Sequence, residues 1–487
     1  MKFNTRKTTD FSSNVAICFI FEDKKRKSAL FETLNKISNS ELDKQIYEQK
    51  TIKGALGENF KYTLNNGTKV LIFGLGKKEA LTRQIFSAQV ANAFRVAKTM
   101  TNNQSIAVEL IENKGVFSKE DSAKITLTGA RIGLYEFNKY KSTKKPEIKT
   151  IELIENDLTQ EVETQAQIGA FTSYAMKFAK DLVNEPAQNL TPKSFADIAS
   201  EVAKEYKLEA KIFNKNQIKD LDMNAFLAVG QGSVNEPMLV HLTYKSKKPT
   251  KKIALIGKGI TFDAGGMNIK PATSMLTMKC DMTGAASVLG IIQAISKLKP
   301  NIELHIICAL CENMTSGSAY KQGDVLKAKN GKTIEVDNTD AEGRITLADA
   351  LCYADTLEVD EVIDIATLTG AVVVSLGNNI TGVMGNNQKQ IDKFLEISKL
   401  NCENTWQMPI LDELKYNLKS EIADMKNTGG RNAGTSTAAW FLSNFTKSKS
   451  WMHLDIAGTA YLEKSNRETL NGPTGVMIRS LIGYLMS

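Results

Sequence analysis

From about Leu208 to the C-terminus, short apolar runs alternate with stretches whose apolar residues recur at helical spacing. The apolar runs predict strands at Ile253–Ile256, Glu303–Cys311, Glu361–Leu368 and Trp451–Ile456. The helical spacing predicts helices around residues 288–295, 347–354, 435–445 and 476–486. This alternation predicts a larger C-terminal α/β/α domain, in which helices cover both faces of a mostly parallel central sheet.

The first third of the chain is also predicted to be α/β. Lys69–Phe73 predicts a buried strand, and a long helical stretch follows through Met100. The lysine-rich segment Lys141–Lys149 contains Pro146 and is typical of a domain boundary. Glu161–Val183 predicts a helix with small and apolar residues on one side. We therefore expect an N-terminal α/β domain at residues 1–160, a linking helix at 161–185 and the larger domain at 186–487.

Two predicted loops carry charged residues where ligands bind in such sheets, beyond the carboxyl ends of strands. The first loop is Gly257–Pro271 with the helix start after it, and the second is Asp337–Arg344. Their charged residues of interest are Lys258, Asp263, Lys270 and Asp281, then Asp340, Glu342 and Arg344. Asp340 and Glu342 stand two positions apart, so an extended segment would direct both side chains the same way.

Carboxylates gathered at strand ends repel one another unless a cation lies between them, and hard divalent cations prefer oxygen ligands. Two ions about 3.5–4 Å apart, with shared carboxylates, suit hydrolysis. Each residue alone has a simpler explanation, because an acid beside a helix start is commonly a cap and a single lysine is commonly exposed. Arg344 alone would pair with a nearby acid. On residue types alone, a metal site and a set of unrelated structural residues both stay open.

Other patterns argue against competing enzyme classes. None of the three histidines belongs to an HExxH motif, so the common helical zinc-protease site is absent from the sequence. Gly331–Thr333 mimics the end of a phosphate-binding loop, but Leu326 stands where that loop requires glycine, which argues against an NTPase. The sequence contains no GxSxG motif, which argues against a serine hydrolase of that type.

Composition adds expectations about the setting. The 487 residues carry a formal net charge of +8 and contain lysine-rich runs. The simpler explanation of these runs is that they are solvated loops. The other explanation is a patch that binds nucleic acid or another polyanion. We expect neither a signal peptide nor a membrane-spanning segment. The six cysteines show no disulfide framework, which predicts a reduced, cytoplasmic setting. Cys308 and Cys311 form a CxxC pair that we expect to be core residues on a strand.

The charged residues of the two loops lie in longer sequence blocks. The block NTDAEGR stands at Asn338–Arg344, and GKGITFDAGG stands at 257–266, with Lys270 and Asp281 after it. Further blocks are LVNEPAQNLTP at 182–192, ATLTGA at 366–371, ADMKNTGGRNAG at 423–434 and HLDIAG at 453–458. In the residue types and spacing of these blocks, from about Leu182 to the C-terminus, the sequence resembles the leucyl aminopeptidase (cytosol aminopeptidase) family.

This resemblance implies a dinuclear-metal aminopeptidase whose catalytic metallopeptidase domain is the larger domain. It assigns two divalent ions, Mn²⁺ or Zn²⁺, to Lys258, Asp263, Asp281, Asp340 and Glu342. Asp263 and Glu342 would be shared between the ions. Lys258 is unusual among these ligands, because lysine coordinates only as a neutral amine, and two nearby dications would lower its pKa.

The remaining implied roles concern catalysis and the substrate. Lys270 and Arg344 would be catalytic, and in the family a bicarbonate at Arg344 is thought to carry the proton. The pocket for the first side chain maps to Met278, Thr367 and Gly370. The implied substrates are peptides with a free N-terminus, from which leucine and other apolar residues are removed preferentially.

Departures from the family pattern are small. Ala264 stands where serine is usual, and Met267–Asn268 replaces a common Ile–Ser pair. Neither change removes an implied metal ligand. Both changes leave the fine substrate preference open. The family also implies a homohexamer. Some members bind DNA, and an additional or replacement role as a DNA-binding regulator on the same fold is therefore the main alternative.

Overall fold

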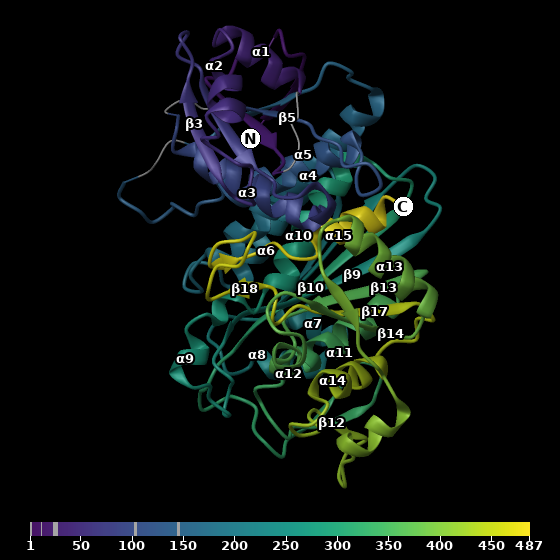
Figure 1. Ribbon diagram of the computed structural model, residues 1–487. Coiled ribbons are helices and arrows are strands. Elements are labelled where there is room, and N and C mark those ends of the chain that lie inside the picture. The colour runs from purple at the N-terminus through teal and green to yellow at the C-terminus, as the bar shows by residue number, and fades with distance from the viewer. Residues whose placement is uncertain (1, 11, 23–27, 102–104, 144–146) are drawn as a thin grey trace. The chain divides into compact units, whose positions relative to one another are not determined.

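The computed structural model describes residues 2–10, 12–22, 28–101, 105–143 and 147–487, which form two compact units (Figure 1). The first unit comprises Met1–Lys177 and Lys464–Leu470, and the second comprises Phe178–Glu463 and Asn471–Ser487. Helix α5 (Gln160–Asn184), at the position of the predicted linking helix, contributes residues to both units. The domain boundaries expected at residues 160 and 185 stay a prediction, and Pro146 of the expected boundary segment lies outside the described residues.

The first unit is built on a six-stranded sheet in the order β1-β6-β5-β2-β4-β3. Its strands are β1 (Lys2–Arg6), β2 (Val15–Ile20), β3 (Asn59–Thr63), β4 (Lys69–Gly74), β5 (Ser105–Glu109) and β6 (Thr150–Ile154). Neighbouring strands run parallel except β3 and β4. The strand predicted at Lys69–Phe73 is β4, and the helical stretch predicted after it is α3 (Arg83–Lys98).

Helices cover both faces of this sheet. Alternate residues of β2 point to opposite sides, and the residues on each side pack against a different helix. Cys18 packs with Phe31 of α1 (Ala29–Ile37) in one core. On the other face, the ring centroids of Phe19 and Phe86 of α3 lie 5.8 Å apart. The other helical segments are α2 (Glu41–Asp43), η1 (Lys44–Glu48), η2 (Lys78–Ala80) and α4 (Lys119–Leu134), which packs beside α3.

The second unit contains an eight-stranded sheet in the order β15-β14-β17-β13-β9-β10-β8-β7. Its strands are β7 (Glu209–Phe213), β8 (Met238–Lys245), β9 (Lys252–Asp263), β10 (Glu303–Asn313), β13 (Glu361–Ala366), β14 (Thr381–Gly385), β15 (Thr405–Gln407) and β17 (Trp451–Asp455). The four central strands β17, β13, β9 and β10 are parallel, whereas β14 pairs antiparallel to β17 and β8 to β10. The smaller sheets are β11 (Val325–Lys327), β12 (Thr333–Glu335) and β16 (Met425–Lys426), and β18 (Tyr461–Leu462) with β19 (Gly472–Pro473).

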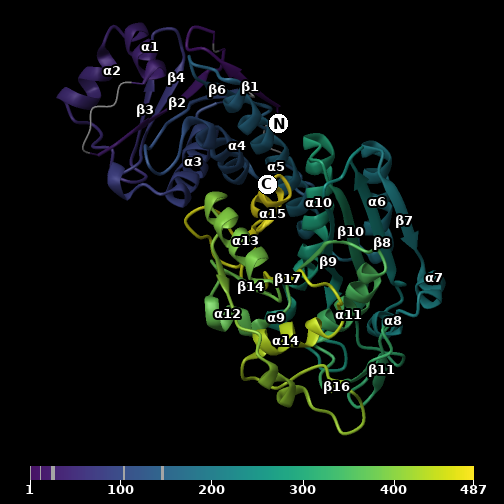
Figure 2. The same cartoon turned by 90° about the vertical axis from the view of Figure 1, so that its right-hand side faces the viewer.

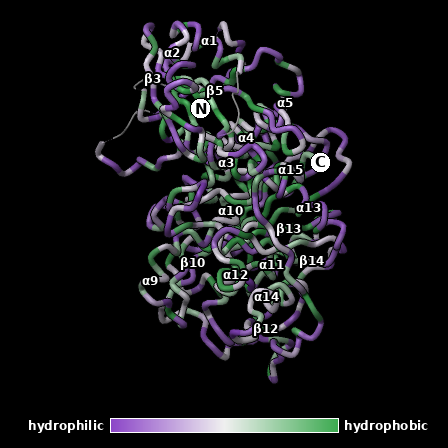
Figure 3. Tube along the Cα trace, viewed as in Figure 1, coloured by the Kyte–Doolittle hydropathy of each residue, from purple (hydrophilic) through white to green (hydrophobic). Residues whose placement is uncertain are grey.

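Helices lie on both faces of the central strands, as the sequence predicts (Figure 2). Ala254 and Ile256 of β9 belong to one core together with Leu347 and Leu351 of α11. The opposite face meets α10, which packs against β9 and α15. The helical segments are α6 (Pro192–Tyr206), α7 (Lys215–Asp220), α8 (Asn224–Gly230), α9 (Ala272–Met275), η3 (Met278–Cys280), α10 (Thr283–Leu298), α11 (Glu342–Asp355), α12 (Gly370–Leu376), α13 (Gln388–Leu400), η4 (Asp412–Leu418), α14 (Gly434–Ser443) and α15 (Ile478–Leu485). Hydrophobic residues gather along these inner elements and hydrophilic residues along the outer loops (Figure 3).

Two local expectations were wrong. The loop predicted to start at Gly257 does not begin there, because β9 continues to Asp263 by pairing with the equally extended β10. The segment from Asp340 to Glu342 is not extended, because Asp340 lies in a turn and Glu342 begins α11.

Two expectations about the setting also have a structural counterpart. All six cysteines are free and buried, and Cys308 and Cys311 lie within β10 as core residues. Among the helices of the described residues, none is both long enough and apolar enough to cross a membrane.

Candidate metal centre

Polar side chains stand at the carboxyl ends of the four central parallel strands. Asp263 ends β9, Asn313 ends β10, Asp455 ends β17, and Thr367 follows β13 directly. Because parallel strands end at the same edge of a sheet, these residues come together where ligands bind in such folds.

The amino-terminal ends of two helices complete the cluster, and glycines permit their close approach. A Cβ at Gly284 in α10 would lie 2.1 Å from the carbonyl oxygen of Ile365, so only glycine lets this end of α10 reach the sheet. A Cβ at Gly343 in α11 would lie 2.6 Å from Nζ of Lys258. These approaches place Asp281, just before α10, and Glu342, the first residue of α11, around Lys258.

Lys258 is the buried cation of the inner part of the cluster. Its Nζ lies 2.8 Å from Asp281 and 3.0 Å from Oε1 of Glu342, and it donates to the carbonyl oxygen of Thr367 at 2.8 Å. The side chains of Lys258, Asp281 and Glu342 are between 2% and 6% exposed. The lysine therefore ties β9 to both helix starts.

Lys270 plays the same part nearer the surface. Its Nζ lies 2.8 Å from Oδ2 of Asp263 and 2.5 Å from Oδ1 of Asp340, whose side chain is 33% exposed. Carboxylate oxygens of Asp263, Asp340 and Glu342 all lie within 4.8 Å of one another. The structure thus brings together six of the seven charged residues predicted from the sequence. They form two ion-pair groups, around Lys258 and Lys270, whose carboxylates meet in one network.

The pKa directions show an excess of buried negative charge. Burial disfavours the charged form of Lys258, but Asp281, Glu342 and Asp263 outweigh it and raise the pKa of Lys258. Burial and the charges of Glu342 and Asp281 raise the pKa of Asp263 well above its ordinary value. Burial raises the pKa of Asp281 to about 6, against the opposing charge of Lys258. For Glu342 the two lysines outweigh burial, and its pKa is lowered.

The donor set fits divalent cations. Buried carboxylates at this spacing need positive charge between them, and divalent cations such as Mg²⁺, Mn²⁺ and Zn²⁺ accept carboxylate oxygens. Every predicted ligand lies in the cluster or is joined to it through Lys258 or Lys270. The residues therefore suit a divalent-metal centre.

Arg344 lies two residues into α11, beside the network and not within it. Its Nη1 donates to the carbonyl oxygen of Asn427 at 2.8 Å, while its Nε is buried without a hydrogen-bond partner among the described residues. Burial lowers the pKa of Arg344 to about 10, although the charges of Glu342 and Asp455 act in the opposite direction. A buried guanidinium with a free donor is suited to hold a small anion.

The three predicted pocket residues differ in their surroundings. Thr367 is tied to the cluster, because its hydroxyl donates to Oδ1 of Asp281 at 2.6 Å. Gly370 begins α12 next to open space, since a Cβ there would meet nothing within 4 Å. Met278 is half-buried in η3, three residues before Asp281.

Sequence reasoning missed two buried residues that support the cluster. Asn313 is fully buried, and its amide donates to Asp263. Asp455 accepts from the amide N–H and the hydroxyl of Thr369, at 3.4 and 2.6 Å, which fixes the loop that carries Thr367. The sequence offered one signal for both Asn313 and Asp455, because each is a polar residue that follows an apolar run at the end of a buried strand.

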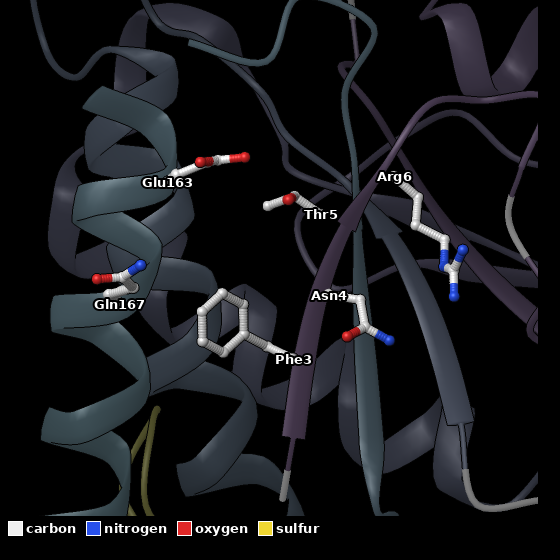
Figure 4. A pocket seen from close by; sticks show the side chains of 6 residues that line it. All are labelled: Phe3, Asn4, Thr5, Arg6, Glu163 and Gln167. Atoms are coloured by element: carbon white, nitrogen blue, oxygen red, sulfur yellow. The ribbon is translucent and has the colours of Figure 1, made fainter. Parts of the chain in front are cut away.

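A separate hollow of about 440 Å³ lies in the first unit, between β1 and α5 (Figure 4). Phe3 and Thr5 point from the strand toward the helix, which contributes Glu163 and Gln167. None of the residues predicted as site residues lines this hollow.

Comparisons with known proteins cover nearly the whole chain. Residues 177–482 match the model of the cytosol aminopeptidase family, catalytic domain, and residues 17–144 match that of its N-terminal domain. A probable cytosol aminopeptidase of Aquifex aeolicus is 42% identical over 448 residues, which cover 91% of this chain and 90% of the relative. One of Persephonella marina is 40% identical over 486 residues, which cover 97% and 96%.

Two solved structures are similar over nearly their full length. A mutant of tomato leucine aminopeptidase superposes with a TM-score of 0.89 at 31% identity, covering 100% of this chain and 96% of that chain. The bottromycin maturation enzyme BotP in complex with Mn superposes with a TM-score of 0.87 at 30% identity, covering 98% and 99%.

Proposed function

The chain belongs to the cytosol aminopeptidase family, and we propose that the cluster around Lys258 and Lys270 is its two-metal centre. Membership of this family makes the chain a metal-dependent aminopeptidase, a hydrolase that acts on peptides. The observation that carries the assignment of the site is the convergence of three carboxylates within 4.8 Å at the carboxyl ends of the central strands. The proposed metal ligands are the carboxylates of Asp263, Asp281, Asp340 and Glu342 together with Lys258. The ammonium of Lys258 pairs with Asp281 and Glu342 in this structure and would lose a proton to coordinate as a neutral amine.

When bound, the divalent ions would supply Lewis-acid activation of water and of the scissile carbonyl. Lys270 is proposed as the donor to the oxygen on which negative charge develops. Burial disfavours its charged form, but Asp263 and the other carboxylates outweigh burial and raise the pKa of Lys270. A fixed cation at that oxygen lowers the barrier more than a mobile one in water.

Arg344 is proposed to hold a small anion, with bicarbonate as the first candidate. Two features support this role, namely the free Nε among the described residues and the neighbouring carboxylates, which keep the guanidinium charged despite its burial. The anion would lie beside the start of α11, close to the ligand Glu342. Its proposed role is that of a proton carrier.

The substrate preference follows from the proposed pocket. Gly370 leaves open space at the start of α12, and Met278 presents a half-buried apolar side chain. We propose that leucine and methionine are good first residues and that acidic ones are poor. Preference among apolar residues should be graded, because a buried methylene contributes about 0.8 kcal/mol.

Further properties are proposed on family grounds. We propose that the protein is a cytoplasmic homohexamer that uses Mn²⁺ or Zn²⁺. The Mn complex of BotP supports the choice of Mn²⁺. The role as a DNA-binding regulator stays an untested alternative.

The experiment that tests the proposed function measures metal content together with hydrolysis of a leucine amide. Chelation should remove both the metal and the activity, and Mn²⁺, Zn²⁺ or Co²⁺ should restore them. Glu342→Gln should lose metal and activity together, because a neutral amide replaces a carboxylate of the cluster. Glu361→Gln is the matched control, because Glu361 is a buried glutamate at the opposite end of the sheet, where it begins β13. Full activity in metal-free protein would contradict the proposal.

A further inference from the structure

Asn313 is a fully enclosed polar residue beside the cluster. It is the last residue of β10, two positions after a register shift in the pairing of β10 with β9, and its exposed fraction is 0%. The register shift aligns Asn313 with Asp263 across the two parallel strands. A buried amide in this position needs partners for its two N–H groups.

All the partners of the Asn313 amide nitrogen are acceptors. Nδ2 lies 2.8 Å from Oδ1 of Asp263, 3.0 Å from the carbonyl oxygen of Thr339 and 3.5 Å from Oε2 of Glu342. These three acceptors fix the orientation of the Asn313 amide. If the amide were flipped, its Oδ1 would face three oxygen atoms without a proton donor. Oδ1 of Asn313 is buried without a hydrogen-bond partner within the described residues.

The two carboxylates that Asn313 touches are each held from two sides. Lys270 engages Oδ2 of Asp263 while Asn313 engages Oδ1. Lys258 engages Oε1 of Glu342 while Asn313 approaches Oε2. Asp263 is therefore fixed by one cationic and two neutral donors, because its Oδ1 also accepts from the N–H of Gly265 at 2.8 Å, whereas Glu342 has one donor of each kind. The neutral donor orients an oxygen without neutralising it, so the negative charge that attracts a cation is preserved.

We propose that Asn313 is a positioning residue of the metal centre, whose amide N–H groups hold Asp263 and Glu342 in the shared orientation that binds two divalent ions. This inference rests on the proposed function, because it requires these carboxylates to be metal ligands. Asn313 itself binds no ion in this role. Hydrogen bonds that orient metal ligands commonly change metal affinity by about 10-fold to 100-fold when they are removed.

The test is Mn²⁺ binding to the metal-depleted full-length protein, measured as stoichiometry and Kd by calorimetry. Asn313→Ala should bind the second Mn²⁺ between about 10-fold and 100-fold more weakly than the wild type. Asn113→Ala is the matched control, because Asn113 is 4% exposed and its Nδ2 donates to the carbonyl oxygens of Lys78 and Leu81 in the first unit. This control loses a buried amide of the same kind and should bind two ions with the affinity of the wild type.

Electron paramagnetic resonance supplies a readout that a loss of stability alone does not change. With two equivalents of Mn²⁺, the wild type should give the signal of a coupled pair, and Asn313→Ala the signal of isolated ions. Where Asn313→Ala does not fold, Asn313→Ser decides, since its single hydroxyl can donate to only one partner and should weaken the second ion at least several-fold. A Kd within two-fold of the wild type and a coupled signal in the folded variant would overturn the inference alone. A wild type that fails to bind two Mn²⁺ would overturn the proposed function, and this inference with it.

Discussion

Replacing Gly343 by alanine tests the geometry of the cluster without removing any ligand. The added Cβ would lie 2.5 Å from Cε of Lys258 and 2.6 Å from its Nζ. Non-bonded carbon atoms prefer separations of about 3.5–4.0 Å, so the lysine end must move by about 1 Å. Lys258 has little freedom to do so, because its Nζ is held by Asp281, Glu342 and the carbonyl oxygen of Thr367 at 2.8–3.0 Å.

The expected cost of Gly343→Ala follows from these contacts. A displacement of about 1 Å stretches at least one of the three hydrogen bonds beyond about 3.5 Å, where it no longer counts as one. A hydrogen bond to a charged group contributes about 1.5–3 kcal/mol, so the variant should lose roughly that much in free energy of unfolding. Misplacement of a catalytic constellation by about 1 Å can lower the rate about 100-fold, which sets the expected loss in kcat/KM for a leucine amide.

Three assays measure these effects in Gly343→Ala, namely denaturant unfolding, kinetics at saturating Mn²⁺ and metal content after dialysis. Gly317→Ala is the matched control, because Gly317 is exposed and an added Cβ there would meet nothing within 4 Å. The control should keep the kcat/KM and the metal content of the wild type. Gly343→Ala with unchanged kcat/KM and unchanged metal content would refute the reasoning, because Lys258 would then not need its present position.

The remaining predictions address catalysis, pH dependence, substrate and assembly. At saturating Mn²⁺, Lys270→Ala should keep both metal ions while kcat falls about 100-fold to 1000-fold, the usual cost of removing one donor to a developing oxyanion. Loss of the metals under these conditions would show that the roles are divided wrongly. Burial disfavours the charged form of His453, but Asp364, 2.5 Å away, outweighs it and raises the pKa of His453 above its ordinary value. The stability from this pair is therefore present below pH about 6.5 and lost as pH rises through the raised pKa of His453. Asp364→Asn should accordingly lower the melting temperature more at pH 6 than at pH 9. Equal losses at the two pH values would contradict this prediction. Digests read by mass spectrometry should show single residues released from free N-termini, and cleavage of N-acetyl-leucyl peptides would contradict the amine-binding site. Light scattering should give the mass of a hexamer under active conditions, and a monomer mass would contradict it.

The alternation of strands and helices was predictable because the central strands are buried on both faces. Runs such as Glu303–Cys311 and Glu361–Leu368 contain few polar residues, and a parallel sheet covered on both faces requires that composition. The full length of β9 was not predictable in the same way. Gly257, Lys258 and Gly259 interrupt its apolar run, and the strand continues only because β10 pairs with it as far as Asp263. Long-range pairing of this kind has no local signal.

The candidate site could be predicted as a set of residue types but not as a geometry. Asp340 and Glu342 were expected to converge from an extended segment, whereas their oxygens come together from a turn and a helix start. Asn313 could not be singled out, because one asparagine after an apolar run is typical of many strand ends. Its importance depends on a partner fifty positions earlier in the chain, Asp263, that only the sheet brings within reach.

Anomalous X-ray scattering from crystals grown with Mn²⁺ would show whether the carboxylates at the ends of the central strands hold two divalent ions. We expect two anomalous peaks for each chain, bounded by Asp263, Asp281, Asp340 and Glu342, with Nζ of Lys258 beside one of them. Peaks that lie elsewhere, in a crystal of fully active protein, would contradict this expectation.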